Sequence, residues 1–337
     1  MRETVRRAVL GVGATCCVLA LSVGAFRSCA DRRVTLRVMA ADALAIPFQQ
    51  LADAFERENP DARVSVTVEG SVMLLRMHLL HPADVVAFAD HRLIEEALRP
   101  EDADWLVKFA TTEIVVARTQ ASRYADEITA DNWAEVLLRP NVLVASPDSA
   151  TDSCGYYTRL AWKLAERHYG TQTPGLFDQL VAKVPAQYQR PDALSILALL
   201  ESRAVDYAFV YRCHAEAHHL PYTRLPEDVG LGKPALESAY SGAEVEVPDF
   251  KGQVVKMKGH PIYFGLTISK RSRQQALAER FVRFVLSANG QGTLRSSDLV
   301  PLTPPHAPAW ATGLPQSLRD VVQFESGPRP ASPDEAR

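Results

Sequence analysis

The sequence predicts an α/β protein with mostly parallel sheets flanked by helices. Short runs rich in β-branched and aromatic residues alternate along the chain with longer runs whose apolar residues recur at helical spacing. This alternation is typical of a parallel sheet with helices on both faces. The chain has 337 residues, 47% of them hydrophobic and 23% charged, so it can bury one large core or two ordinary ones.

Seven strands are predicted from short apolar runs of β-forming residues, such as DYAFVY and PIYFGLTI. Some runs alternate polar and apolar residues, which indicates a half-buried strand, and others are continuously apolar, which indicates a strand buried on both faces. The predicted strands cover residues 34–39, 64–68, 83–87, 113–117, 142–145, 206–211 and 261–268.

The predicted helices have apolar residues three and four positions apart. Leu51 and Phe55 share one face of the first long helix, and Leu277, Phe281 and Phe284 share one face of the last. The predicted helices cover residues 48–58, 132–138, 193–201 and 274–286, with a short helix after Ser71 and a longer one from Gly155. We found no internal repeat and no long low-complexity linker.

The stretch from residue 142 to 157 combines a strand, a polar loop and a helix start. The first backbone N–H groups of a helix have no partner within it, and they carry the positive end of its dipole. Such a helix start suits an anion. Ser149, Thr151 and Ser153 add hydroxyl donors, while Asp152 adds a carboxylate. A simpler interpretation is that Asp152 or Ser153 only caps the helix.

Polar residues also follow the earlier strands. Asp42 follows the first strand, Ser71 the second, and Asp90 with His91 the third. In open α/β sheets, ligands bind beyond the carboxyl ends of the strands. We therefore group these residues with Asp152 as candidates for one binding site.

The N-terminus carries a targeting signal. Three arginines precede nineteen largely apolar residues, 8–26, which predicts an export signal or membrane anchor over residues 1–30. The residues before Cys29 match a lipobox poorly, so cleavage, lipidation and retention as an anchor all stay open. Cys154 and Cys213 are the two cysteines beyond this segment, and a disulfide between them stays equally open.

The charge balance argues against a nucleic-acid partner. Residues 1–30 hold four arginines and one glutamate, so the remaining chain has 33 basic and 39 acidic residues and a formal charge of −6. Nucleic-acid binding requires basic surface, which this balance disfavours. A local pocket field can still favour a small anion.

Other motifs favour structural roles. His214 and His218 have a spacing that can hold zinc, but no third ligand is evident and a solvated helix surface is the preferred interpretation. Arg212 is expected to form a salt bridge, and His168 to favour a helix C-terminus. No nucleophile paired with a base is evident, so we predict no enzyme activity and no cofactor.

Several separate segments carry a family resemblance. They include LRVMAADALAIPFQQLADAFERENP, VEGSV, ADVVAFADHRLI, DSCGYY, LLESRAVDYAFVYR, and GHPIYFGLTISK with LVPLTPP. On these segments the chain resembles the tungstate/molybdate solute-binding proteins of ABC transporters, from about residue 34 to about residue 305.

The resemblance implies a two-lobed periplasmic binding protein fold of type II, with chain crossovers near Ala117 and His260. Lobe one would comprise residues 31–116 and 260–325, lobe two residues 117–259, and residues 326–337 a disordered tail. The lobes of such proteins close over a small oxyanion. It also implies an extracytoplasmic monomer whose partner is the permease of a transporter.

Residues at the family's binding positions partly match. Ser71 matches an oxyanion-binding serine, and Asp152 matches an aspartate that in the family can coordinate the metal centre of the oxyanion. Asp42, Ala43 and Leu44 stand where the family has Gly-Ser-Leu.

Three further positions depart from the family pattern. Phe88 replaces a serine, Phe264 replaces a tyrosine, and Ala193 replaces a glutamate next to Asp192. The predicted ligand-binding residues are Asp42, Ala43, Ser71, Phe88, Thr151, Asp152, Asp192, Ala193 and Tyr211. Each lost donor to a charged ligand costs about 1.5–3 kcal/mol. Two lost hydroxyls therefore weaken oxyanion binding by roughly two to four powers of ten.

The leading hypothesis is an exported protein that delivers tungstate or molybdate to an ABC importer. One alternative keeps transport but changes the ligand, to another anion or to a less charged or cationic solute that suits Asp42 and Asp152. Another alternative is a membrane-tethered sensor or interaction module that has lost high-affinity oxyanion binding.

Overall fold

The computed structural model describes residues 33–326. The predicted export signal or anchor at residues 1–30 lies outside the described residues, and so do residues 327–337 of the predicted tail. Within the described part, no helix is both long and apolar enough to cross a membrane.

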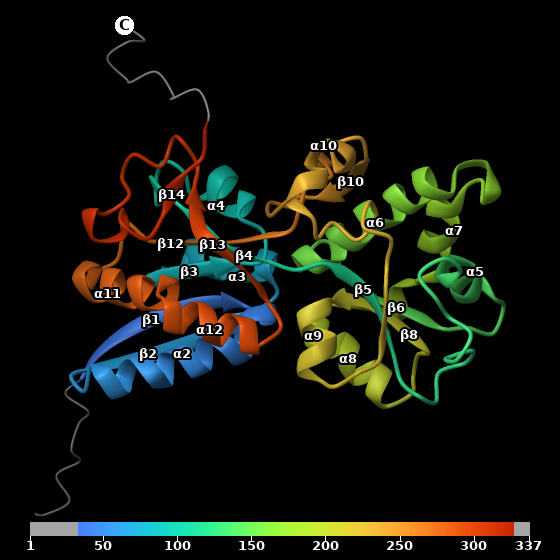
Figure 1. Cartoon of the computed structure of the whole chain (residues 1–337), viewed down its shortest axis with the longest axis horizontal. Coiled ribbons are helices and arrows are strands. Elements are labelled where there is room, and N and C mark those ends of the chain that lie inside the picture. The colour runs from blue at the N-terminus through green and yellow to red at the C-terminus, as the bar shows by residue number, and fades with distance from the viewer. Residues whose placement is uncertain (1–32, 327–337) are drawn as a thin grey trace, which may run out of the picture. The chain divides into compact units, whose positions relative to one another are not determined.

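Seven strands form the larger sheet, in the order β14–β13–β4–β12–β3–β1–β2 (Figure 1). β1 pairs with β3 in parallel, whereas β12 pairs with both β3 and β4 in antiparallel ladders. The strands are β1 (Val34–Ala41), β2 (Ala62–Glu69), β3 (Val85–Phe88), β4 (Val107–Thr111), β12 (Tyr263–Ile268), β13 (Val300–Ala307) and β14 (Gln323–Phe324).

Five helices accompany this sheet: α2 (Ala45–Glu58), α3 (Ser71–Leu80), α4 (Arg92–Ala97), α11 (Gln275–Leu286) and α12 (Ala288–Ser296). Phe55 of α2 meets Phe281 of α11 edge-on, with ring centroids 5.3 Å apart, and Phe48 meets the same ring at 6.4 Å. Because both rings of α2 are fully or almost fully buried, this aromatic contact anchors the two helices to one core.

Five strands form the smaller sheet, in the order β7–β6–β8–β5–β9. β6 pairs with β7 and β8 in parallel, and β5 pairs with β8 and β9 in antiparallel ladders. These strands are β5 (Ile114–Arg118), β6 (Val144–Pro147), β7 (Gln189–Arg190), β8 (Tyr207–Tyr211) and β9 (Tyr222–Arg224). A separate antiparallel hairpin joins β10 (Glu244–Pro248) and β11 (Val254–Lys258).

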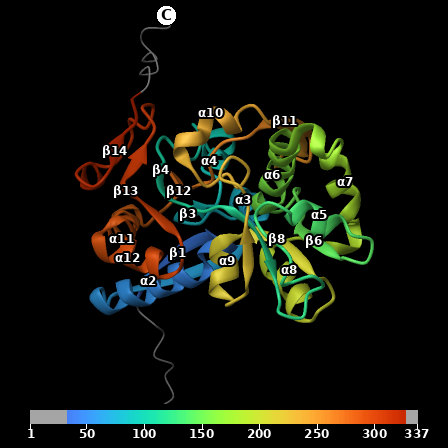
Figure 2. The same ribbon diagram turned by 45° about the vertical axis from the view of Figure 1, so that its right-hand side comes forward.

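Helices α5 (Trp133–Leu138), α6 (Ser153–Tyr169), α7 (Leu176–Lys183), α8 (Ala193–Glu201) and α9 (Arg212–Ala217) accompany the smaller sheet, and α10 (Glu237–Tyr240) precedes the hairpin (Figure 2). Trp133 and Trp162 both meet Phe209 of β8 edge-on, with ring centroids 5.8 Å and 5.4 Å away. This aromatic group packs α5 and α6 on the sheet.

The chain passes between the two sheets at short connections. Thr112 and Glu113 join β4 of the larger sheet to β5 of the smaller one, and the chain returns after the hairpin at β12. Arg212 and Arg224 both pair with Glu113, at 3.2 Å and 2.7 Å. The salt bridge predicted for Arg212 is confirmed, and it fixes one of the connecting residues.

Most predicted elements are confirmed with small shifts in their ends. Helix α8 has the predicted bounds, while α2 begins three residues earlier than predicted because Ala45, Ile46 and Pro47 already belong to it. β6 extends through Ser146 and Pro147, which were predicted to form a turn. The sequence prediction missed several elements, among them β13, whose prolines argue against a strand.

Candidate functional site

Asp42 lies at a contact between residues of the two sheets. It begins a short 3-10 helix directly after β1, and its side chain is buried. One carboxylate oxygen accepts a hydrogen bond from the Ala43 N–H at 2.8 Å, and the other accepts one from the Ala193 N–H at 3.0 Å. Because Ala193 is the first residue of α8, the carboxylate occupies the positive end of that helix.

Asp152 caps helix α6 and is fully buried. Its Oδ1 accepts from the Cys154 N–H at 2.9 Å, which confirms the capping interpretation. Its Oδ2 is buried without a hydrogen-bond partner. Burial, followed by repulsion from Asp42, raises the pKa of Asp152 well above its usual range. This oxygen therefore needs a partner, which can be a proton shared with the Asp42 carboxylate, a cation or a metal centre.

Three buried hydroxyl groups lie together beside these carboxylates. The Ser153 hydroxyl donates to Ser71 at 3.3 Å and lies 3.0 Å from the Tyr211 hydroxyl. Ser71 also accepts from the Ala89 N–H at 3.1 Å. Because burial raises the pKa of Tyr211, the phenol keeps its proton and can donate. The cluster thus joins Ser71, at the start of α3, to residues of α6 and β8.

The remaining predicted site residues have defined places. Asp192 caps α8, accepting from the Ser195 N–H at 2.7 Å and from its hydroxyl at 3.0 Å. Thr151 donates through its hydroxyl to the Pro191 carbonyl at 2.8 Å. Phe88 ends β3 with its side chain buried in an apolar cluster that includes Leu74. Phe88 therefore contributes to the core rather than to the polar group.

His214 is a neighbour of this group that the sequence analysis missed. Its Nε2 lies 3.7 Å from Asp42 Oδ1, and its ring stacks on Tyr211 with centroids 5.8 Å apart and planes at 21°. Neither ring nitrogen has a hydrogen-bond partner. The prediction that His214 lies on a solvated helix surface was wrong, because α9 starts directly after the buried strand β8 and turns this side chain inward.

A metal site at the histidine pair is not supported. His218, four residues further on, pairs instead with Glu201 at 2.9 Å. Among residues 33–326, no group of three or more His, Cys, Asp or Glu side chains is arranged to hold a metal ion. His214 and His218 therefore have too few neighbouring ligands to form a stable transition-metal site.

Gly70 lies at a close approach of backbone between elements of the two sheets. A Cβ atom added there would lie 2.9 Å from the Thr151 carbonyl oxygen and 3.1 Å from Asp152 Cβ. Next to it, the Met73 N–H donates to the same Thr151 oxygen at 3.0 Å. A residue without a side chain is therefore what allows α3 to reach the start of α6.

A second buried polar group surrounds Asp90. Tyr156 of α6 donates to Asp90 Oδ2 at 2.7 Å, and Arg92 pairs with the same oxygen at 2.9 Å. Burial opposes ionisation, but Arg92 and His260 outweigh it and lower the pKa of Asp90 well below its usual range. The Tyr157 hydroxyl lies 3.1 Å from His260 Nε2. Asp90 therefore has both a cationic partner and a hydrogen-bond donor, as a structural contact requires, while the neighbouring His91 Nδ1 has no hydrogen-bond partner.

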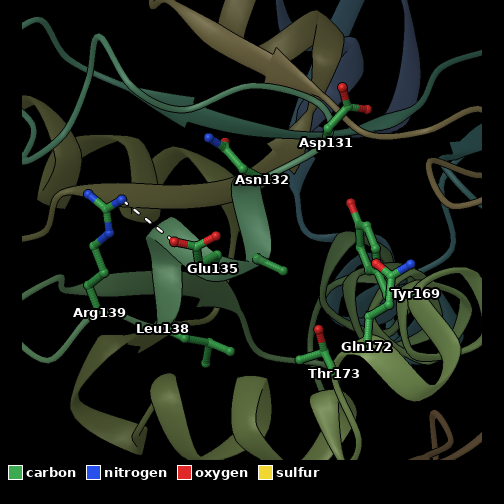
Figure 3. A pocket seen from close by; sticks show the side chains of 9 residues that line it. Asp131, Asn132, Glu135, Leu138, Arg139, Tyr169, Gln172 and Thr173 are labelled. Carbon is green, nitrogen blue, oxygen red and sulfur yellow. Dashed lines mark ion pairs between the residues drawn. The ribbon is translucent and has the colours of Figure 1, made fainter.

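A pocket of about 480 Å³ lies elsewhere, between α5 and the end of α6 (Figure 3). Its wall carries the ion pair of Arg139 with Glu135 at 3.8 Å, together with Tyr169. It contains none of the predicted site residues. We assign it no ligand.

Cys154 and Cys213 are both free thiols and both buried. The disulfide that the sequence left open is therefore not formed in this structure. Burial raises the pKa of Cys213 to about 12, so it is a protonated, unreactive thiol at neutral pH.

Two sheets with helices on their faces, joined by two chain crossovers, define the class: the protein has the two-lobed fold of type II periplasmic binding proteins. The periplasmic molybdate-binding protein of Azotobacter vinelandii superposes with a TM-score of 0.58 and 16% identity, covering 79% of this chain and 98% of that chain. The sulfate-binding protein SubI of Mycobacterium tuberculosis H37Rv gives 0.56 and 15% identity, covering 87% and 94%. At these identities the likeness shows the fold alone.

The chain belongs to the bacterial extracellular solute-binding protein family, whose model matches residues 36–297. A solute-binding protein of Petrotoga mobilis is 34% identical over 289 residues, covering 85% of this chain and 89% of the relative. The molybdate/tungstate-binding protein WtpA of Thermococcus kodakarensis is 33% identical over 344 aligned positions and covers 94% of each chain. These relatives are solute-binding proteins rather than enzymes, and the family is extracytoplasmic.

Proposed function

We propose that this protein captures molybdate or tungstate between its two lobes and delivers the anion to an ABC importer. A relative that covers 94% of the chain is named as a molybdate/tungstate-binding protein, which supports this ligand class. The proposed site comprises Asp152, Ser71, Ser153 and Tyr211. The protein would act as an extracytoplasmic monomer, held at or released from the membrane by its N-terminal segment.

The observation that carries the proposal is the unpartnered, buried Oδ2 of Asp152. A carboxylate oxygen repels sulfate or phosphate, because all the oxygens of those anions are acceptors and their central atoms take no further ligand here. The molybdenum or tungsten centre of a tetrahedral oxyanion can instead accept an additional oxygen ligand. Asp152 thus favours a metal oxyanion over an ordinary one, while the hydroxyls of Ser71, Ser153 and Tyr211 can donate to its oxygens.

Asp42 opposes this ligand and supports a second candidate. Its carboxylate already accepts the Ala193 N–H, which is a donor an oxyanion would use, and it adds negative charge near Asp152. A less charged or cationic solute would be favoured by the two carboxylates. This second candidate keeps the transport role and changes only the cargo.

Isothermal titration calorimetry with tungstate, molybdate, sulfate and phosphate separates the two candidates. We expect tungstate and molybdate to bind, sulfate and phosphate to give no heat, and Asp152→Ala to abolish the tungstate signal. Asp148→Ala is a suitable control, because Asp148 lies on the same loop but caps a turn through the Ala150 N–H at 2.9 Å. Absence of heat and of any melting shift with all four anions would reject the oxyanion and leave the second candidate.

A further inference from the structure

A second pocket, of about 390 Å³, opens beside Asp42. Its lining residues come from the start of α2, the start of α8 and helix α9, with the end of α12 and the residues after it at its edge. The apolar part of its wall is formed by Ala45, Ile46 and Pro47 of α2 with Leu194 of α8. Ile46 and Leu194 are 45% and 39% exposed, so the apolar surface reaches the mouth of the pocket. The volume is that of a site for a small organic molecule.

The inner end of this pocket holds acceptors that lack donors. His214 lines it with both ring nitrogens unpartnered, although the side chain is only 3% exposed. Burial lowers the pKa of His214, so at neutral pH the ring is uncharged and one nitrogen is an acceptor. Asp42 lies 3.7 Å from it and uses only one lone pair on each oxygen for the Ala43 and Ala193 N–H groups. The neutral ring carries its one N–H on the other nitrogen, so its acceptor nitrogen and the free lone pairs of Asp42 would be satisfied by a ligand that donates several hydrogen bonds.

The charged residues that line the pocket indicate whether its ligand is a cation or an anion. Asp42, Glu216 and Asp298 line it, and no lysine or arginine does. The nearby Arg212 pairs with Glu113 at 3.2 Å and with the lining residue Glu216 at 3.9 Å, and Glu216 also accepts from the Tyr222 hydroxyl. Because Glu216 already has a cationic partner, the negative charge of the pocket comes from Asp42 and Asp298, and it favours a positively charged ligand.

We propose that this pocket binds a small protonated aliphatic amine, with the ammonium group at Asp42 and His214 and the carbon chain against Ile46 and Leu194. An ammonium group has three N–H donors and a full charge, which matches two acceptors at the inner end of an acidic pocket. A bare metal ion fits less well, because no group of three or more ligating side chains among the described residues is arranged for one and the wall beside the acceptors is apolar.

The amine site and the oxyanion site share Asp42. An ammonium ion at Asp42 would offset the charge that opposes an anion near Asp152, so the two ligands should bind cooperatively. This coupling rests on the proposed oxyanion function, whereas binding of the amine alone does not. By linkage, the factor by which the amine strengthens tungstate binding equals the factor by which tungstate strengthens amine binding, and we expect about fivefold or more.

Titration of the purified protein with butylammonium chloride, monitored by calorimetry with and without saturating tungstate, tests the proposal. Sodium butyrate and 1-butanol are matched controls, since each has four carbons with a negative charge or none. We expect butylammonium to bind and both controls to give no heat.

Two variants test the placement of the amine. Asp42→Asn removes the charge while keeping the side-chain shape, and it should weaken butylammonium binding about tenfold or more. Ile46→Lys places a cation at an exposed position in the pocket mouth, so its effect does not depend on a change in the core, and it should weaken binding similarly. Leu80→Lys adds the same charge at a residue that is 76% exposed and outside the pocket lining, and it should leave binding unchanged.

The outcomes separate the two proposals. Binding of butylammonium without any binding of tungstate supports the amine pocket and rejects the oxyanion. Binding of tungstate with no butylammonium heat, or with equal effects of Ile46→Lys and Leu80→Lys, overturns the amine pocket and leaves the oxyanion site. Binding of both ligands with no mutual effect keeps the pocket and rejects the coupling through Asp42.

Discussion

Tyr156 donates a 2.7 Å hydrogen bond to Asp90, a residue that follows a strand of the other sheet. The acceptor is ionised, because the pKa of Asp90 is held low by Arg92 despite burial. Hydrogen bonds to charged groups contribute about 1.5–3 kcal/mol each. This contact therefore stabilises the arrangement in which helix α6 lies against the loop after β3.

Tyr156→Phe should weaken tungstate binding about five- to fiftyfold while lowering the melting temperature only slightly. The aromatic ring is kept, and Asp90 keeps Arg92 as its partner. The variant therefore loses only the hydrogen bond that joins the two lobes. Calorimetry measures the affinity. Tyr169→Phe is the control, because its hydroxyl bonds to the Ala130 carbonyl at 3.2 Å within one lobe. Equal affinities for the two variants would show that the Asp90 contact does not contribute to binding.

Gly70→Ala should reduce tungstate affinity about tenfold or more, because the added methyl group would meet the Thr151 carbonyl at 2.9 Å and hold α3 away from α6. The backbone angles of Gly70, φ −57° and ψ 140°, are allowed for alanine, so the expected effect comes from the steric clash of the methyl group and not from backbone strain. In α12, Gly292 has no atom within 4 Å of an added Cβ, and Gly292→Ala should leave affinity unchanged. An unchanged affinity for Gly70→Ala would mean that binding does not need this approach.

Tungstate binding should release protons through Asp152. Because burial and Asp42 raise its pKa, the Asp152 carboxyl group holds its proton more tightly in the empty protein than a free carboxyl group does, and it must lose that proton to coordinate a metal centre. The calorimetric heat should therefore vary with the ionisation enthalpy of the buffer. Asp152→Asn should lose that component. Proton uptake by the wild type, or the same buffer dependence in both proteins, would contradict coordination through this oxygen.

Stability should fall between pH 6.5 and pH 4 through His260. Burial, aided by Arg92, lowers the pKa of this histidine to about 4, below its usual value of 6.5. The folded protein thus disfavours the protonated ring, so its contribution is complete above pH 6.5 and is lost as the pH falls through about 4. His91 acts in the same pH range, since its pKa is also lowered from 6.5, whereas the lowered pKa of Asp90 causes a loss of stability only below pH 3.8.

Comparing the pH dependence of the unfolding free energy in the wild type and in His260→Gln shows how much of it comes from His260. Urea unfolding at pH 7 and pH 4.5 should show a smaller stability loss for His260→Gln than for the wild type, whereas His81→Gln, at an exposed position, should match the wild type. Equal losses in all three proteins would assign the pH dependence to other groups.

Helices with strong apolar periodicity were predictable from the sequence. Helix α8 has the predicted ends because Asp192 caps it, and α11 differs by one residue. β13 was missed because it contains three prolines, and proline lacks the N–H that a strand ladder uses. The strand becomes clear only when its antiparallel pairing with β4 is seen.

The contacts of the site were less predictable than its residues. The strand–loop–helix pattern indicated Asp152, and its cap is confirmed. The hydrogen bond from Ala193 to Asp42 joins residues 151 positions apart, and local pattern carries no signal for such a pairing. His214 was missed for the same reason, since its burial depends on Tyr211 and Asp42 rather than on the spacing of the histidines.

The place of β12 has a consequence for how the chain acquires its structure. This strand lies between β3 and β4, although it follows them in sequence by more than 150 residues, so the larger sheet stays split until Ile268 has been made. The smaller sheet uses one continuous stretch, residues 114–224. We therefore expect amides of β6 and β8 to gain protection before those of β3 and β4 in pulsed hydrogen exchange during refolding. Simultaneous protection of both sets would indicate a single cooperative folding unit.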